Sequence, residues 1–200
     1  MPKIEEKNNF ASATAELSVE HQHILKVLSA LRAQCDRVEA GAAPDREFFL
    51  KALGFIRNYA DKFHHAKEED ILFPALSSPG VEMHCDPREQ MLHEHELGRG
   101  FVRGMDAALK EGRPVELVEN ARNYCGLLEQ HIYKEDNILY PMAEEALGPA
   151  RSAELKKRFA AVDAKFAASV KGSALISCQR TMPSLSISKT ACNGICSKSS

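Results

Sequence analysis

Two stretches decide the fold: FHHAKEEDILFP at residues 63–74 and HIYKEDNILYP at residues 131–141. Both contain a histidine, three residues, a glutamate, an acid, one further residue, Ile-Leu, an aromatic residue and a proline. The two histidines are 131 − 64 = 67 residues apart. Each copy places titratable groups where an apolar face begins, and a buried charge is costly unless it is paired. The repeat therefore raises the question of what these side chains face.

Helical hydrophobic periods surround both stretches, and strand patterns are nearly absent. Breaks at glycine and proline divide the chain into expected helices at residues 14–39, 46–76, 87–111, 115–147 and 151–170. Four long helices with short connections predict an all-α protein, an antiparallel up-down-up-down four-helix bundle over residues 12–150. Residues 151–171 form an additional amphipathic helix that packs on the bundle. The Ser-rich, aperiodic residues 172–200 predict a flexible tail.

Composition limits the classes of function. The 200 residues carry a net charge of −2 and no basic patch with interleaved aromatic residues, so a nucleic-acid partner is not expected. No apolar run approaches the roughly 18 residues of a membrane span, and residues 1–10 are too polar for a signal peptide. We therefore expect a cytoplasmic protein without a membrane partner. The six cysteines suggest no disulfide framework.

The apolar stripe of each long helix contains titratable residues. In residues 115–147 the stripe passes through His131 and Glu135 and continues to Ile138 and Met142. In residues 46–76 the stripe passes through His64 and Glu68 and continues to Ile71 and Ala75. The other two helices place one histidine each on their stripes, namely His21 and His95. The same spacing predicts that His65 and Glu69 point sideways or out, and that His23 and His93 lie on polar faces.

Four histidines and two glutamates are thus expected to point inward at matching depth. Two ionised carboxylates in an apolar core would be costly and would repel each other, and a pair of divalent cations removes both problems. Spacing of i, i+4 places both donors of one helix beside one metal. Mixed imidazole and carboxylate donors suit iron or manganese, whereas structural zinc prefers thiolate; we favour iron. Ordinary core histidines, or a salt-bridged network without metal, are the alternatives. The expected metal ligands are His21, His64, Glu68, His95, His131 and Glu135.

The ordered motifs resemble the hemerythrin-like, or HHE cation-binding, domain family. The resemblance rests on EHQHI at residues 20–24, HHAKEEDILFP at 64–74, EHEL at 94–97 and HIYKEDNILYP at 131–141, and it covers about residues 14–147. It implies a four-helix bundle with a non-haem di-iron centre. The four histidines would be terminal ligands, and Glu68 and Glu135 would bridge the two irons beside an oxo or hydroxo group.

The chain departs from the oxygen-carrying hemerythrins at two places. These carriers have a further histidine four residues before the third-helix one, where this chain has Met91. Their last carboxylate is an aspartate at +5, a spacing that Asp136 offers here in addition to Glu135. With one nitrogen ligand fewer, open coordination positions would favour chemistry over reversible oxygen holding.

Three functions remain open. In the first, the centre binds O2, NO, peroxide or iron and senses or buffers it. A sensor would signal through an unidentified protein partner. Alternatively it is a di-iron enzyme with peroxidase, catalase-like or NO-reducing activity, or its ligands are vestigial in an interaction protein.

Tyr124 lies on the last long stripe and is interpreted as a core residue. The spacing of Cys192 and Cys196 is a weak metal or redox signal, and the third tail cysteine is Cys178.

Overall fold

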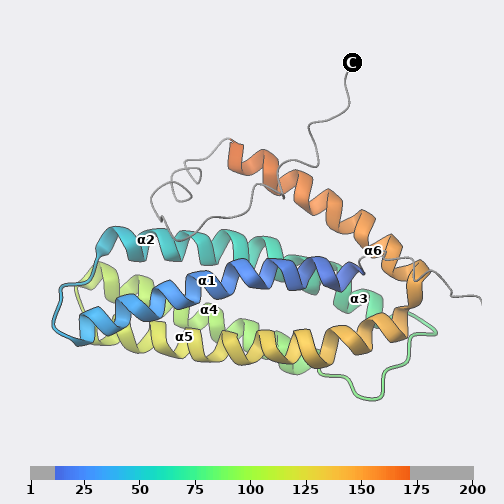
Figure 1. Cartoon of the computed structure of the whole chain (residues 1–200), viewed down its shortest axis with the longest axis horizontal. Coiled ribbons are helices and arrows are strands. Elements are labelled where there is room, and N and C mark those ends of the chain that lie inside the picture. Colours follow the sequence, from blue (N-terminus) through green and yellow to red (C-terminus); the bar gives the residue numbers. More distant parts are fainter. Residues whose placement is uncertain (1–11, 172–200) are drawn as a thin grey trace, which may run out of the picture.

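The computed structural model describes residues 12–171, and every regular element in that range is a helix (Figure 1). The elements, in chain order, are α1 (Ala13–Glu39), α2 (Arg46–Phe55), the π-helical η1 (Ile56–His65) and η2 (Glu68–Leu72), α3 (Phe73–Leu76), α4 (Arg88–Glu111), α5 (Pro114–Lys134), the π-helical η3 (Glu135–Leu139) and α6 (Tyr140–Lys171). The predicted tail, with Cys178, Cys192 and Cys196, lies outside the described residues.

Four long helical rods form a bundle. They are α1; the continuous run α2–η1–η2–α3; α4; and α5–η3 with the first part of α6. In Figure 1 the rods lie side by side along the long axis of the molecule. α4 packs along α5, α1 packs along α5 and α6, and α2 contacts α4. The predicted all-α helical bundle is therefore confirmed.

Local sequence signals account for the helix ends. The Ser12 side chain accepts a hydrogen bond from the Ala15 backbone N–H at 3.2 Å and caps α1. α4 ends at Glu111 and is capped by Gly112, whose φ of 68° is the left-handed conformation that glycine adopts without strain. Gly148 has the same φ and is followed by Pro149, so α6 bends there. The predicted break between the fourth and fifth helices is confirmed.

The π-helical segments change the phase of two rods. Backbone bonds of a π-helix join residues i and i+5, so each π segment shifts the following residues around the axis. Leu139 at the end of η3 and Ala143 beyond it are buried, whereas Ile138 is 46 % exposed. The expected stripe through Ile138 and Met142 was therefore wrong by one position. A uniform α-helical period cannot anticipate such an insertion.

Two apolar clusters fill the bundle, with a polar layer between them. Along α1, Leu17 belongs to one cluster and Ile24 to the other. His21 lies between these two residues and is fully buried. Along α5 and η3, Ile132 and Leu139 belong to different clusters in the same way. The polar layer is therefore closed by packed side chains at both ends.

The part of α6 after Gly148 packs across the bundle (orange in Figure 1). Leu155 and Phe159 are buried in the same cluster as Leu17. Phe166 stacks on Phe63 of η1, with ring centroids 4.4 Å apart. This segment therefore covers the outer side of the rod that contains the first repeat.

We expect Phe49→Ala to lower the free energy of unfolding by about 3–5 kcal/mol, because the Phe49 ring is fully buried and truncation leaves a cavity. Leu50→Ala is the control, since Leu50 is 47 % exposed and its loss should cost little. Urea unfolding at a fixed metal concentration measures both. Equal losses in the two variants would contradict the placement of α2.

Candidate metal centre

Six donor side chains meet in the polar layer, and each of them is buried. They come from all four rods. The residues are His21 of α1, His64 and Glu68 of the second rod, His95 of α4, and His131 and Glu135 of the fourth rod. The structure thus brings together all six residues that the sequence analysis selected, and it places His23 and His93 outside the layer.

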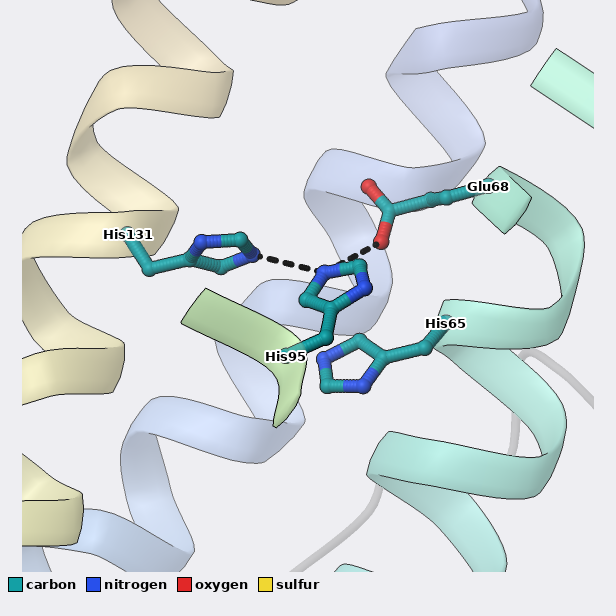
Figure 2. Close-up of side chains that lie close together, drawn as sticks. All are labelled: His65, Glu68, His95 and His131. Carbon is teal, nitrogen blue, oxygen red and sulfur yellow. Dashed lines mark hydrogen bonds and ion pairs between the residues drawn. The ribbon is translucent and has the colours of Figure 1, made fainter. Parts of the chain in front are cut away.

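Together with His65 of η1, these donors form two groups that share one carboxylate. One group is His65, Glu68, His95 and His131, and the other is His21, His64, Glu68 and Glu135. Within each group the ligand atoms lie within 4.8 Å of one another. Figure 2 shows the first group, in which three imidazoles from three rods gather beside the Glu68 carboxylate. Glu68 therefore lies where one side chain could serve two cations.

The orientation of His65 differs from the one predicted from the sequence. It was expected to point sideways or out, but it is buried and its ring stacks on that of His95, with centroids 3.8 Å apart and planes 10° apart. His65 is the last residue of η1, and the wider π-helical turn lets two adjacent histidines face the interior. Glu69 is half-buried, which agrees with the expected sideways orientation.

Buried polar atoms of the layer test whether it fits cations. Within residues 12–171, Oε2 of Glu68 and both carboxylate oxygens of Glu135 have no hydrogen-bond partner. The Glu135 oxygens lie 3.0 Å from Nε2 of His131 and 3.2 Å from Nε2 of His21, without hydrogen-bond geometry. Buried carboxylate oxygens without a hydrogen bond are rare, because each costs free energy. The donor set therefore fits positive ions that bind oxygen and nitrogen together.

The electrostatics of the layer support the same conclusion. Burial and the repulsion of Glu135 raise the pKa of Glu68 well above its usual range. Burial opposes the ionisation of Glu135, but His131 and His21 hold its pKa well below the usual range. Burial likewise disfavours a charged His131, whereas Glu135 and Glu94 raise its pKa to about 9. Protons on Glu68 and His131 thus reduce the repulsion between the two buried carboxylates, and bound cations would replace these protons.

Each of the four predicted histidine ligands donates a hydrogen bond to a carboxylate on the outer side of the polar layer. Nδ1 of His21 lies 2.9 Å from Asp136, that of His64 2.8 Å from Glu20, that of His95 2.6 Å from Glu69 and that of His131 2.8 Å from Glu94. A carboxylate on one ring nitrogen fixes the tautomer and leaves the other nitrogen free for a metal. Every Nε2 therefore faces the interior of the layer.

These outer carboxylates explain why an acidic residue stands next to an inward donor in each of the four motifs. Each acid adjoins an inward donor on its own rod and orients an imidazole on another rod: Glu20 beside His21 orients His64, and Glu94 beside His95 orients His131. Asp136 beside Glu135 orients His21 in the same way. The pattern could not be read from sequence, because the partner is always on another helix.

A buried lysine holds one of the outer carboxylates. Lys67 Nζ donates to Glu20 at 2.5 Å and pairs with Asp163 of α6 at 2.6 Å. The ammonium also lies 4.2 Å from the centroid of the Phe63 ring. Although Lys67 is only 1 % exposed, its charge is therefore fully paired. The last part of α6 thus reaches His64 through a chain of three charged side chains.

Tyr140 belongs to the polar layer and was not predicted from the sequence. Its hydroxyl donates to Oε1 of Glu68 at 2.5 Å and lies 3.4 Å from Nε2 of His21. The sequence signal was the aromatic position of the repeat, which is Phe73 in the first copy. Phe73 stacks near His95, with centroids 6.3 Å apart, so both copies place an aromatic ring against an imidazole. Only the second copy adds a hydroxyl.

A helical bundle that encloses a buried layer of glutamates and imidazoles, with a carboxylate hydrogen-bonded to the outer nitrogen of each predicted histidine ligand, is typical of metal-binding proteins. The family model described as Hemerythrin HHE cation binding domain matches residues 2–143, and the chain belongs to this family. Comparison with curated proteins and with solved structures returns no match. None of the helices among residues 12–171 is long and apolar enough to span a membrane.

We expect His64→Ala to lose most of the bound metal, because it removes an oriented inward imidazole. His65→Ala should lose a smaller share of the metal, because Nδ1 of His65 has no hydrogen-bonded carboxylate that orients the ring. His93→Ala is the control and should keep full metal content, because His93 is exposed. Metal analysis of the three purified variants measures this. Full metal content in His65→Ala would instead support the prediction that His65 points away from the metal site.

Proposed function

We propose that the layer holds two iron ions in each chain. His65, His95 and His131 would hold one ion, and His21 and His64 the other. Glu68 would bridge them because it belongs to both groups. Glu135 is the second proposed bridge, since its two oxygens face Nε2 atoms of His131 and His21. The buried carboxylate oxygens without hydrogen-bond partners are the observation that carries this proposal.

The donor chemistry supports iron. All donors are imidazoles and carboxylates, a combination that suits iron or manganese. The thiols of Cys35 and Cys125 are buried in an apolar cluster and belong to neither group. A structural zinc site would normally include such thiolates. Facing carboxylates from two helices of a bundle are also typical of di-iron proteins.

The rod directions complete the proposed architecture. In Figure 1 the connections between consecutive rods lie at alternating ends of the molecule, which supports an antiparallel up-down-up-down course. This course would place the two repeats at the same depth of the bundle.

A pair of bound irons supplies binding and redox chemistry for O2, NO or peroxide, and we propose this as the function of the centre. The residues of the chain prepare the site for it. The four outer carboxylates orient the imidazoles, and the two apolar clusters restrict water. Met91 is buried in one of these clusters, so this turn of α4 supplies no imidazole. His65 supplies one from the second rod instead.

Tyr140 favours an enzyme as the second candidate. Its phenol lies at the shared carboxylate, and burial together with Glu135 and Glu68 raises its pKa well above the usual range. The phenol thus keeps its proton and stays a hydrogen-bond donor beside the reacting centre. Peroxidase, catalase-like and NO-reducing reactions all develop negative charge on oxygen, which a buried hydrogen-bond donor can stabilise.

Two irons per chain are expected after expression with ample iron, with near-ultraviolet charge-transfer absorption in the oxidised protein. The reason is that five buried imidazoles share two buried carboxylates. Metal analysis and Mössbauer spectroscopy measure the stoichiometry and the number of iron environments. A single metal per chain, or zinc alone under these conditions, would overturn the bridged di-iron site.

Exposure of the reduced, iron-loaded protein to O2 separates the two candidate functions. We expect irreversible oxidation and some turnover of peroxide, and Tyr140→Phe should lower peroxide turnover by about tenfold or more, because it removes the buried donor. Tyr133→Phe is the matched control, since Tyr133 is 65 % exposed. Full recovery of the reduced spectrum when O2 is removed would instead indicate a reversible carrier.

A further inference from the structure

Both copies of the repeat contain a lysine three residues after the histidine and directly before the glutamate. These lysines are Lys67 and Lys134. The i, i+3 spacing places each lysine close to the histidine of its own copy, which is His64 or His131. A lysine ammonium has three hydrogen-bond donors and no acceptor, so it cannot bind a cation itself. Any role beside the metal layer must therefore come from the group to which the lysine donates.

In the first copy, the histidine and the lysine hold one carboxylate between them. Nδ1 of His64 lies 2.8 Å from Oε2 of Glu20, and Nζ of Lys67 donates to Oε1 of the same carboxylate at 2.5 Å. Both carboxylate oxygens are thus occupied, which fixes the orientation of the group. Because Glu20 is only 8 % exposed, solvent offers little replacement for either contact.

The second copy forms the same contacts with the same atoms. Nδ1 of His131 lies 2.8 Å from Oε2 of Glu94, and Nζ of Lys134 donates to Oε1. The carboxylate comes from α4 in this copy and from α1 in the first. The two copies therefore use different pairs of rods and reach one arrangement, in which a lysine supports the carboxylate that orients its neighbouring imidazole.

The two lysines differ in how far they are covered. Lys67 is 1 % exposed, whereas the side chain of Lys134 is 28 % exposed. Nζ of Lys67 lies 2.6 Å from Oδ1 of Asp163 and 5.5 Å from the centroid of the Phe159 ring. Both of these residues lie in the helix after Gly148, one turn apart on the same face. This helix therefore closes the first copy, and the second copy is partly open to solvent.

We propose that Lys67 and Lys134 are positioning residues of the metal centre, and that the helix after Gly148 makes the two metal positions unequal. Each lysine holds the carboxylate that orients the imidazole of its own copy. The ion bound by His64 is retained longer than the ion bound by His131, because a fully covered ammonium keeps its carboxylate in place. The inference deepens the proposed di-iron function and rests on it for the two ions.

Release of iron from the reduced, iron-loaded protein to a strong ferrous chelator tests the proposal under anaerobic conditions. We expect two phases. Lys67→Met should accelerate the slower phase about tenfold, because the carboxylate behind a ligating imidazole loses its support. Lys134→Met should accelerate only the faster phase, by roughly threefold, since its ammonium is more exposed. The control Lys110→Met removes a lysine that is 64 % exposed and should change neither phase.

Asp163→Asn tests the contribution of the last helix while Lys67 stays in place. The replaced side chain is half-buried and asparagine has the same size, so the protein should fold normally. The variant should accelerate the slower phase roughly threefold, and Asp163→Glu should restore the wild-type rate because it restores the charge. Glu154→Gln is the matched control, since it removes another carboxylate of α6 that binds a lysine, and both partners are exposed.

Iron content, measured for every protein, separates this proposal from the di-iron proposal. Two irons with unchanged phases in Lys67→Met would overturn the positioning role and leave the di-iron site standing. Equal acceleration of both phases would indicate a loosened bundle and would also overturn that role. If Lys67→Met does not fold, Asp163→Asn and Lys134→Met decide by the same criteria.

A single iron in the wild type would overturn the di-iron proposal. Faster release of that iron in Lys67→Met or Lys134→Met, but not in Lys110→Met, would then still support the positioning role of the lysine concerned. Unchanged release in all three variants would overturn both proposals.

Discussion

The fold depends on placing two buried carboxylates in one layer of the bundle. Glu68 and Glu135 are both inaccessible to solvent, and their repulsion helps to raise the pKa of Glu68. Such a pair destabilises a core unless positive charge lies between or beside the two groups. Imidazoles from all four rods surround them, so the helices can pack only in an arrangement that satisfies this layer. The proposed cations would supply the same compensation more strongly than protons do.

The outer carboxylates make the layer a property of the whole bundle. Glu20, Glu69, Glu94 and Asp136 each orient an imidazole of a different rod, so no helix positions its own histidine alone. A shift of one helix along its neighbour would break hydrogen bonds on both. This mutual dependence explains why charged residues can be dense in a core that is apolar at both ends.

The chain extends this network beyond the part that the family model matches. Lys67 connects Glu20 to Asp163, which lies in the last part of α6 and outside residues 2–143. The ammonium is covered by the rings of Phe63 and Phe159. The helix after Gly148 therefore contributes both apolar cover and one charge to the surroundings of His64. Removal of this helix would expose a lysine that the bundle alone does not pair fully.

The sequence by itself determined the helical class, the helix boundaries to within a residue or two, and six of the residues that meet in the polar layer. These follow from local rules: glycine and proline interrupt helices, and a period of three and four residues identifies the inward face. The repeat of His, Glu and Ile-Leu made the interpretation of His64 and His131 specific. His21 and His95 followed from the same periodicity.

Only the tertiary structure decided the inward position of His65, the role of Tyr140 and the cross-helix carboxylates. The π-helical segments shift the phase of two rods, and an i→i+5 turn has no simple sequence signal. Tyr140 meets Glu68 across 72 positions of the chain, and Asp136 meets His21 across 115. Periodicity within one helix shows which face is buried, but the partner of a buried group depends on how separate helices are placed against one another.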